Sequence, residues 1–306
     1  MKKLTFAVTA IFSAVFASSA SADISVSGSV IAGAVNDGAA SSTTVRTGGG
    51  VSFALSTTTD NGIAISTGAG ISRDTDGNSA AAVTGLKSVT FASGGSSLTV
   101  GNMKVVGRDT GGIGGVISDF SNSSTVGASG VSTALTAVEG HGVSLSTSMG
   151  GASVTAAMLY DLGNTDNEGA TNATTGAAGV EVSLPMGALA TTVGFAQYDP
   201  ASGASEQTTG VSAAYTMAAG TLTVGYQSSD LATDATATGA KLVTSMGGAS
   251  LSLGYKTVKK STTTSTTQIA ISQPLGGGAS VFAEVDNSSG TGTDGTAFAI
   301  GTSVSF

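Results

Sequence analysis

The sequence has no cysteine and no tryptophan, and it contains a single histidine, His141, among 306 residues. Without cysteine the chain can form neither a disulfide nor a thiolate metal site. A hydrolase needs a nucleophile, a base and an orienting group. The only imidazole available as a base lies between Gly140 and Gly142, which argues against such a site. Zinc-protease, P-loop and nucleophile-elbow motifs are also missing. We therefore predict no enzyme, no catalytic residue and no cofactor.

Charged residues are scarce as well, at 10% of the chain, and most of them are acidic. If Lys2 and Lys3 are removed with a leader, nine basic and nineteen acidic residues remain, which is a net charge of −10. A protein that binds nucleic acid needs a basic surface to neutralise phosphates. The charge balance therefore excludes nucleic acid as a partner.

Only one long apolar run is present, from Leu4 to Ala17. Two lysines precede this run, and the A-x-A-like end Ala20-Ser21-Ala22 follows it. A basic start, an apolar middle and a small-residue end are typical of a secretory signal peptide. The run is short and poor in large apolar residues for a membrane anchor. We predict a cleaved signal peptide at residues 1–22 and a single domain at residues 23–306.

Glycine, serine, threonine and alanine make up much of the remaining chain, with 46 glycines. Such a composition favours β structure or disorder over helix. Disorder is opposed by a regular alternation, in stretches of about ten residues, that is typical of transmembrane barrel strands. Val51, Phe53 and Leu55 alternate with small or polar residues, and Leu222 to Gln227 repeat the pattern. The chain is therefore predicted to be all-β.

Two kinds of connection alternate between these stretches. Seven short connections carry the glycine or asparagine that tight hairpins require. They lie at 60–62, 94–95, 150–151, 186–187, 219–220, 247–248 and 276–278. Eight longer, polar loops lie at about 36–43, 73–83, 103–141, 161–175, 198–207, 228–238, 257–266 and 286–295. Fifteen connections predict sixteen strands in a closed antiparallel barrel, with tight turns on one rim and loops on the other.

The chain resembles the Gram-negative general porins, most closely the alphaproteobacterial type. The resemblance is carried by the opening strand Asp23–Gly28, the hairpin that begins at Gly276, the closing strand Ala297–Phe306 and one very long third loop. It implies a homotrimeric barrel in the bacterial outer membrane, in contact with lipopolysaccharide, that passes small hydrophilic solutes and ions by diffusion. It also implies that Phe306 is the signal read by the barrel assembly machinery.

In that family the third loop folds into the lumen and constricts it, and residues 103–141 form the longest loop here. The loop offers Arg108 and the carboxylates Asp109, Asp119 and Glu139 as constriction residues. Strand alternation also directs two cations and two carboxylates toward the lumen, namely Arg46, Lys241, Glu181 and Glu284. Two wall cations are fewer than the family pattern implies.

Most of the acidic residues fall in the predicted loops. Carboxylate oxygens suit hard ions, so we consider weak calcium binding by Asp74, Asp76, Asp166 and Glu168. An acidic pore also concentrates cations, which predicts a mild cation selectivity.

Other functions remain open at this stage. The composition also fits a secreted adhesin or surface-layer protein, built as a β-solenoid or a sandwich. The varying loop lengths and the terminal Phe306 argue against that alternative. A barrel enzyme such as a lipase is opposed by the near absence of histidine.

Overall fold

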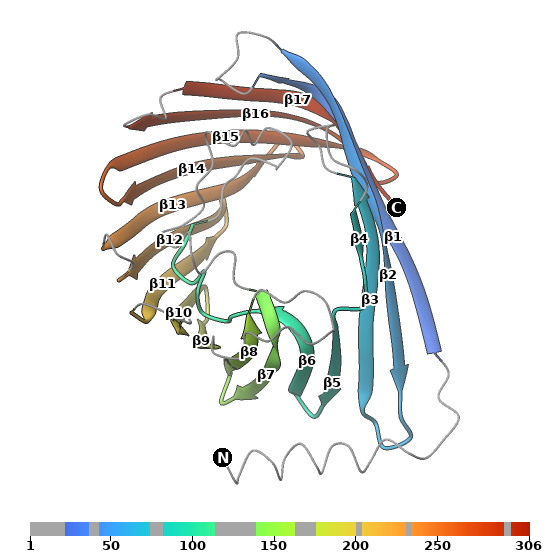
Figure 1. Cartoon of the computed structure of the whole chain (residues 1–306). Helices are drawn as coiled ribbons and strands as arrows, with labels where there is room; N and C mark the ends of the chain where they lie inside the picture. Colours follow the sequence, from blue (N-terminus) through green and yellow to red (C-terminus); the bar gives the residue numbers. More distant parts are fainter. Residues whose placement is uncertain are drawn as a thin grey trace.

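The computed structural model describes residues 22–36, 43–73, 82–113, 139–162, 176–199, 204–230, 234–290 and 295–306. Across these ranges the regular secondary structure is β-strand (Figure 1). None of the described segments is a helix with the length and apolarity that a membrane crossing needs.

The strands follow one another along the chain and join a single antiparallel sheet. The first half comprises β1 (Ala22–Asn36), β2 (Thr44–Thr58), β3 (Ala64–Arg73), β4 (Ala82–Thr84), β5 (Ser88–Ser93), β6 (Ser96–Lys104), β7 (Glu139–Met149) and β8 (Ala152–Leu162). The second half comprises β9 (Gly176–Met186), β10 (Leu189–Asp199), β11 (Glu206–Met217), β12 (Gly220–Ser229), β13 (Ala235–Met246), β14 (Ala249–Lys259), β15 (Thr263–Gly276), β16 (Ala279–Gly290) and β17 (Gly295–Ser305).

Seventeen strand segments occupy sixteen places in the wall. Both β4 and β5 pair with β3, at residues 70–72 and 64–66 respectively, so they are two parts of one interrupted strand. The first strand pairs with β2 on one side and with β17 on the other, which closes the sheet into a ring. The predicted closed antiparallel barrel of sixteen strands is confirmed.

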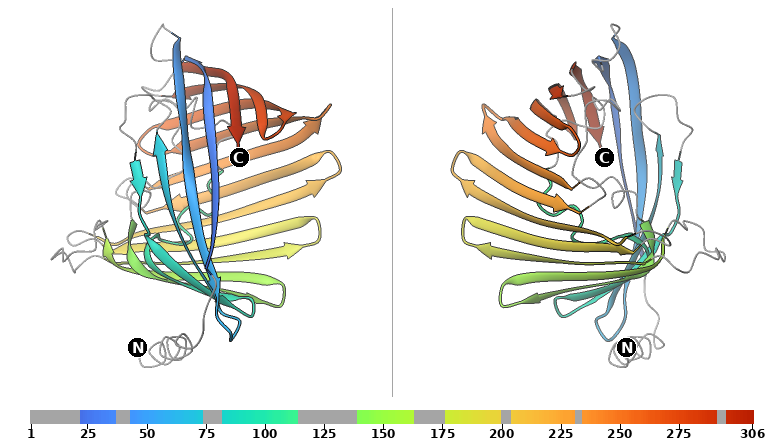
Figure 2. Two further views of the ribbon diagram at one scale, coloured as in Figure 1. Left: turned by 90° about the vertical axis from the view of Figure 1, so that its right-hand side faces the viewer. Right: turned by 60° about the vertical axis from the view of Figure 1, so that its left-hand side comes forward.

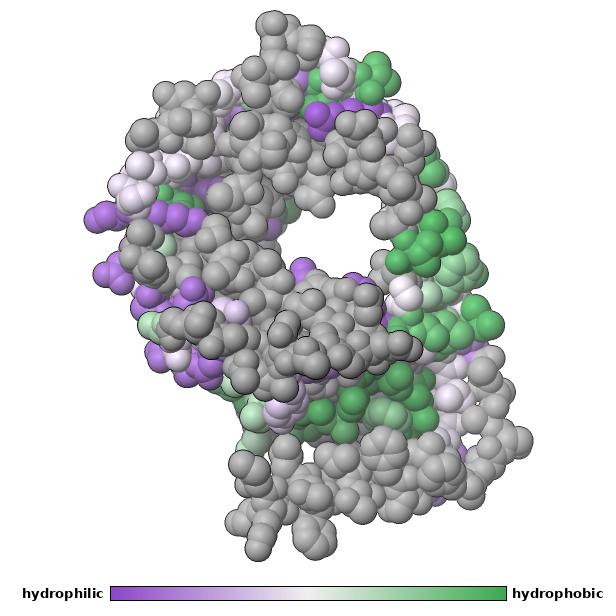
Figure 3. Space-filling model, in the orientation of Figure 1, coloured by the Kyte–Doolittle hydropathy of each residue, from purple (hydrophilic) through white to green (hydrophobic). Residues whose placement is uncertain are grey.

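Strand alternation places large apolar side chains on the outside of this ring. Cross-strand neighbours share a face, as Leu253, Ile269 and Val285 do across β14, β15 and β16. Their relative exposures are 38%, 47% and 43%, although all three are large hydrophobic residues. A continuous apolar surface of this kind is typical of a wall that faces lipid, and part of it is visible in Figure 3.

Tight turns join the strands along one rim (Figure 2). Gly94 and Gly95 have φ angles of 57° and 81°, and Gly247 and Gly248 have angles of 61° and 85°. Residues with a Cβ rarely adopt this left-handed conformation, which explains the glycines of the predicted turns.

On the opposite rim, some strands are longer than the sequence pattern suggests. The predicted loops at 257–266 and 286–295 are too wide, because β14 continues to Lys259 and β16 to Gly290. Hydroxyl and amide side chains pair across these extensions, as Thr266 and Ser288 do at 3.0 Å. Polar residues therefore continue the strands here, where their polarity led us to expect loops.

The last residue completes the closure. The amide N–H of Phe306 donates to the carbonyl of Gly28 at 3.0 Å, and the Gly28 N–H donates back at 2.9 Å. A Cβ at Gly28 would lie 2.9 Å from Cε2 of Phe306, so the aromatic ring covers the space that the glycine leaves. Phe306 thus belongs to the seam of the barrel.

Candidate functional site: the third loop and the inner wall

The chain enters the inside of the barrel directly after β6. Residues Val105–Ile113, drawn in green in Figure 1, cross the interior beside strands β8 to β13. Figure 3 shows an opening through the molecule in the same orientation. This described part of the third loop therefore lies against one side of the interior, as predicted for a loop folded into the lumen.

An apolar contact holds the start of the segment. Val105, which is 3% exposed, packs in a buried cluster with Leu159 of β8, Ala177 of β9 and Ala196 of β10. Buried apolar area stabilises such a contact by about 25 cal/mol per Å². The loop is therefore packed on the wall from its first residue.

Hydrogen bonds continue the attachment further along the segment. The Thr110 hydroxyl donates to Glu181 Oε2 of β9 at 2.6 Å. The side-chain amide of Gln227, on β12, donates to the Arg108 carbonyl. Because the hydroxyl donates to a carboxylate, the first bond is of the stronger, charge-assisted kind.

Two adjacent charges on the loop have opposite exposures. Arg108 Nε lies 3.0 Å from Asp109 Oδ2, and the two side chains are 5% and 67% exposed. The arginine is thus packed into the protein, whereas the carboxylate remains in contact with solvent. Asp109 is therefore the charge of this pair that remains accessible from the interior.

A second polar group lies on the inner faces of β14, β15 and β16. Gln268 Nε2 donates to Asp286 Oδ2 at 2.9 Å, and Asp286 is 0% exposed. Lys256 and Glu284 are also buried, at 8% and 6% exposed. The alternation of these strands points all four side chains away from the apolar outer surface.

The predicted wall residues do not come together. Arg46 is half-buried on β2, opposite Gly33 in the register, and Lys241 is half-buried on β13, opposite Thr223 and Gly254. Strands β2 and β13 lie on different sides of the ring (Figure 1). These two cations therefore form no cluster with each other, and their role at a constriction stays a prediction.

Several predicted site residues fall outside the described residues, namely Asp74, Asp76, Asp119, Asp166 and Glu168. Glu139 begins β7, but its side chain is outside the description too. Within the described residues, no three His, Cys, Asp or Glu side chains form a group that could hold a metal. The calcium ligands accordingly stay predictions.

Sequence reasoning missed Lys256, Gln268 and Asp286. The sequence pattern predicts a loop at Asp286, because the polar residues after it obscure the end of β16. The signal was nevertheless present, since Lys256 and Asp286 continue the inward alternation of β14 and β16. Counting alternate positions through polar strand ends would have identified both.

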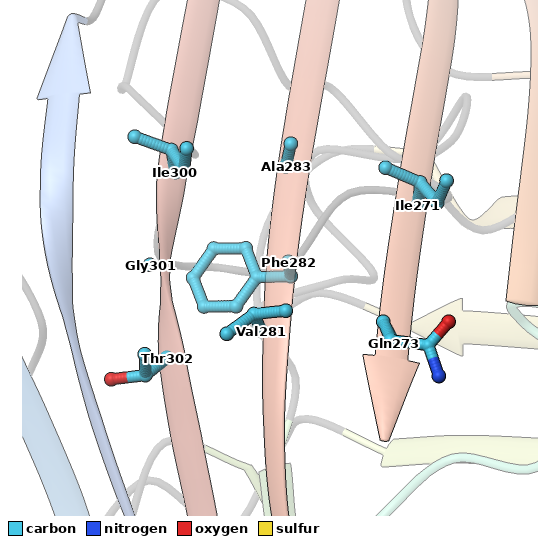
Figure 4. Close-up of a pocket in the computed structure, with 8 residues that line it drawn as sticks. All are labelled: Ile271, Gln273, Val281, Phe282, Ala283, Ile300, Gly301 and Thr302. Carbon is cyan, nitrogen blue, oxygen red and sulfur yellow. The ribbon is translucent and has the colours of Figure 1, made fainter. Parts of the chain in front are cut away.

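A separate apolar hollow of about 490 Å³ lies between β15, β16 and β17 (Figure 4). Ile271, Val281 and Ile300 line it, and all three are exposed on the lipid-facing side. Phe282 and Gly301 also line it, and the Phe282 ring lies toward Gly301. This hollow lies in the outer wall and is distinct from the polar interior.

Residues 7–293 match the family model described as Gram-negative porin. Among solved structures, a porin refined at 1.8 Å resolution superimposes with a TM-score of 0.67 at 17% identity, covering 93% of this chain and 100% of that one. A loop-deletion mutant of OmpT, an outer membrane protein of Vibrio cholerae, gives 0.70 at 14% identity, covering 93% and 99%. A mutant of the Rhodopseudomonas blastica porin gives 0.65 at 16% identity, covering 93% and 100%. Curated protein sequences give no significant match.

Proposed function

Because the chain belongs to the Gram-negative porin family and folds as a closed sixteen-strand barrel of the outer membrane, we propose that it passes small hydrophilic solutes and ions by passive diffusion with a mild preference for cations. Sixteen strands enclose an interior wide enough for water, whereas eight would be filled by side chains. The observation that carries the proposal is the position of Val105–Ile113 inside the ring, where this described part of the third loop packs on the inner wall and takes up part of the interior.

The preference for cations rests on charge. The chain has a formal net charge of −8, and the loop exposes Asp109 while its neighbour Arg108 is buried. A passage lined by one sign of charge raises the local concentration of ions of the opposite sign. Arg46 and Lys241, which lie apart on the wall, reduce this preference without reversing it.

The remaining parts of the proposal follow from the family. The chain works as a homotrimer among outer-membrane lipid and lipopolysaccharide, after cleavage of residues 1–22 and assembly guided by Phe306. It has no catalytic role, since the family and the fold are those of channels. Calcium bound at Asp74, Asp76, Asp166 or Glu168 is a subordinate proposal.

The test is conductance in a planar lipid bilayer, using the folded protein purified in detergent. We expect stable ohmic openings that appear in steps of three, and a reversal potential in a salt gradient that favours cations. Absence of any conductance from correctly folded barrel would refute the channel. A reversal potential that favours anions would refute only the selectivity, and single steps would refute only the trimer.

A further inference from the structure

Five glycines form a diagonal line on the inner wall beneath the third loop. We call Gly179, Gly194, Gly210, Gly225 and Gly239, one from each of β9 to β13, the glycine track. Gly194 faces Gly210 directly in the register, and Gly225 faces Gly239. Between these two pairs the line shifts by two residues, because Gly210 faces Gln227. The track therefore crosses five strands obliquely.

The loop segment lies in contact with every member of the track. An added Cβ would lie 2.9 Å from the Val106 carbonyl carbon at Gly179 and 2.8 Å from the Gly107 oxygen at Gly194. At Gly225 it would lie 2.7 Å from Ile113 Cδ1. Folded proteins essentially never show such distances for a real Cβ, so the backbone of the loop, with the side chains of Thr110 and Ile113, occupies the volume that side chains on the track would fill.

The fit is close from the loop side as well. Gly107 and Gly111 have φ angles of 83° and 80°. A Cβ on Gly107 would lie 2.9 Å from the Phe195 nitrogen, and one on Gly111 would lie 2.7 Å from the Val211 nitrogen. Glycines on both the loop and the wall thus allow the two backbones to approach without intervening side chains.

We propose that the glycine track is a size determinant of the pore: it recesses the third loop into the wall, and the missing side chains set how far the loop stands into the passage. This inference rests on the proposed channel function. Any side chain on the track would lift the loop toward the pore axis, because the wall blocks movement in the other direction. The track residues are positioning residues, since they act on solutes only through the loop.

The wall across the ring supplies matched controls. Gly68 and Gly70 of β3 occupy inward positions, beside Ala54 and Ser52 in the register. Among the described residues, a Cβ there would come no closer than 3.2 Å and 3.3 Å to a heavy atom outside its own chain neighbours, and those nearest atoms belong to β2. Alanine at either site adds the same methyl group to the interior without touching the described loop segment.

The experiment compares single-channel conductance of Gly210→Ala and Gly210→Val with Gly70→Ala in the full chain. We expect conductance to fall by roughly 20–50% with alanine, further with valine, and not with the control, because conduction depends on the narrowest diameter. The uptake of larger sugars into vesicles should fall in parallel. Equal conductance in all variants, or a rise in the track variants, would overturn the proposal.

A second measurement applies even if Gly210→Ala and Gly210→Val do not fold. The chain has no native cysteine, so Ile113→Cys with Gly239→Cys creates a single possible disulfide. The built Cβ of Gly239 lies 2.9 Å from Ile113 Cβ, and a small outward shift reaches the 3.5–4.5 Å that a disulfide takes. We expect a crosslink, seen as a reductant-sensitive shift in mobility of the denatured chain, and none between Ile113→Cys and Gly70→Cys.

The two measurements separate the two proposals. Failure of the Ile113–Gly239 crosslink in folded barrel would overturn the glycine track whatever the conductance. If the double-cysteine variant forms the crosslink but its reduced form does not conduct, the channel function would be refuted. The loop would still be shown to lie on the track.

Discussion

At the scale of single residues, the carboxylates of this barrel have different roles. Glu181 accepts a hydrogen bond from the third loop, Asp286 accepts one from Gln268 within the wall, and Asp109 stays open to solvent. Only an exposed charge is available to ions that pass through. Net charge alone therefore overstates how many carboxylates contribute to selectivity.

Asp109→Asn is expected to weaken the cation preference. A unit charge about 10 Å from the ion path favours a cation and disfavours an anion by about 0.4 kcal/mol each in a water-like dielectric, so the cation-to-anion permeability ratio should fall by about a factor of four. The reversal potential in a salt gradient measures this ratio. Asp60→Asn, in a tight turn on the rim, is the control, and equal shifts in both variants would contradict a special role for Asp109.

At the scale of elements, the third loop is held by packing, by close backbone contact and by side-chain hydrogen bonds. Val105 packs in an apolar cluster, and Thr110 reaches Glu181 from the middle of the segment. A loop attached at several points along its length narrows the interior without needing a regular structure of its own. The strands beneath the loop supply the hydrogen-bond acceptor, Glu181, and the glycine track that leaves room for the loop.

Thr110→Val is expected to loosen this attachment while keeping the shape of the side chain. The loss of a donor to a carboxylate costs about 1–3 kcal/mol locally, because Glu181 is left without that partner. We expect greater open-channel noise in bilayer recordings. Thr110→Ser retains the hydroxyl and should restore quiet openings; noise equal to that of Thr110→Val would show that the hydrogen bond is unimportant.

At the scale of the whole molecule, strand alternation places large apolar side chains on the exterior and mostly small or polar side chains in the interior, apart from clusters such as the one around Leu159. Adjacent residues of one strand therefore experience different solvents, as Ile269 and Ala270 of β15 do. The exterior of this ring suits lipid, and the interior suits water.

Ile269→Arg is expected to destabilise the folded barrel by about 2–4 kcal/mol, the cost of a cation on the lipid face near the bilayer centre. Ala270→Arg should cost much less, because its side chain enters the interior, although it should reduce conductance. Folding into lipid vesicles under a urea gradient measures both stabilities. Similar losses in the two variants would contradict the assignment of the two faces.

The sequence by itself determined the class, the strand number and the connectivity. Alternation with period two and glycine at turns are local properties, and they predicted Phe306 in a closing strand and the third loop as the longest connection. Strand ends were less certain where polar residues continue the sheet, as at Asp286, because polarity alone does not distinguish an inward strand position from a loop.

Only the tertiary structure decided which distant residues meet. The glycine track consists of five residues on five strands, and their alignment depends on the register between neighbours and on the path of the loop across them. Likewise, nothing local distinguishes Glu181, which binds Thr110, from Glu284, which lies elsewhere on the wall. Pairing between residues far apart in the chain depends on how the whole sheet closes. The physical reason is that register depends on matching the alternation of both partner strands and on the turns that join them, and these offsets add up across several strands.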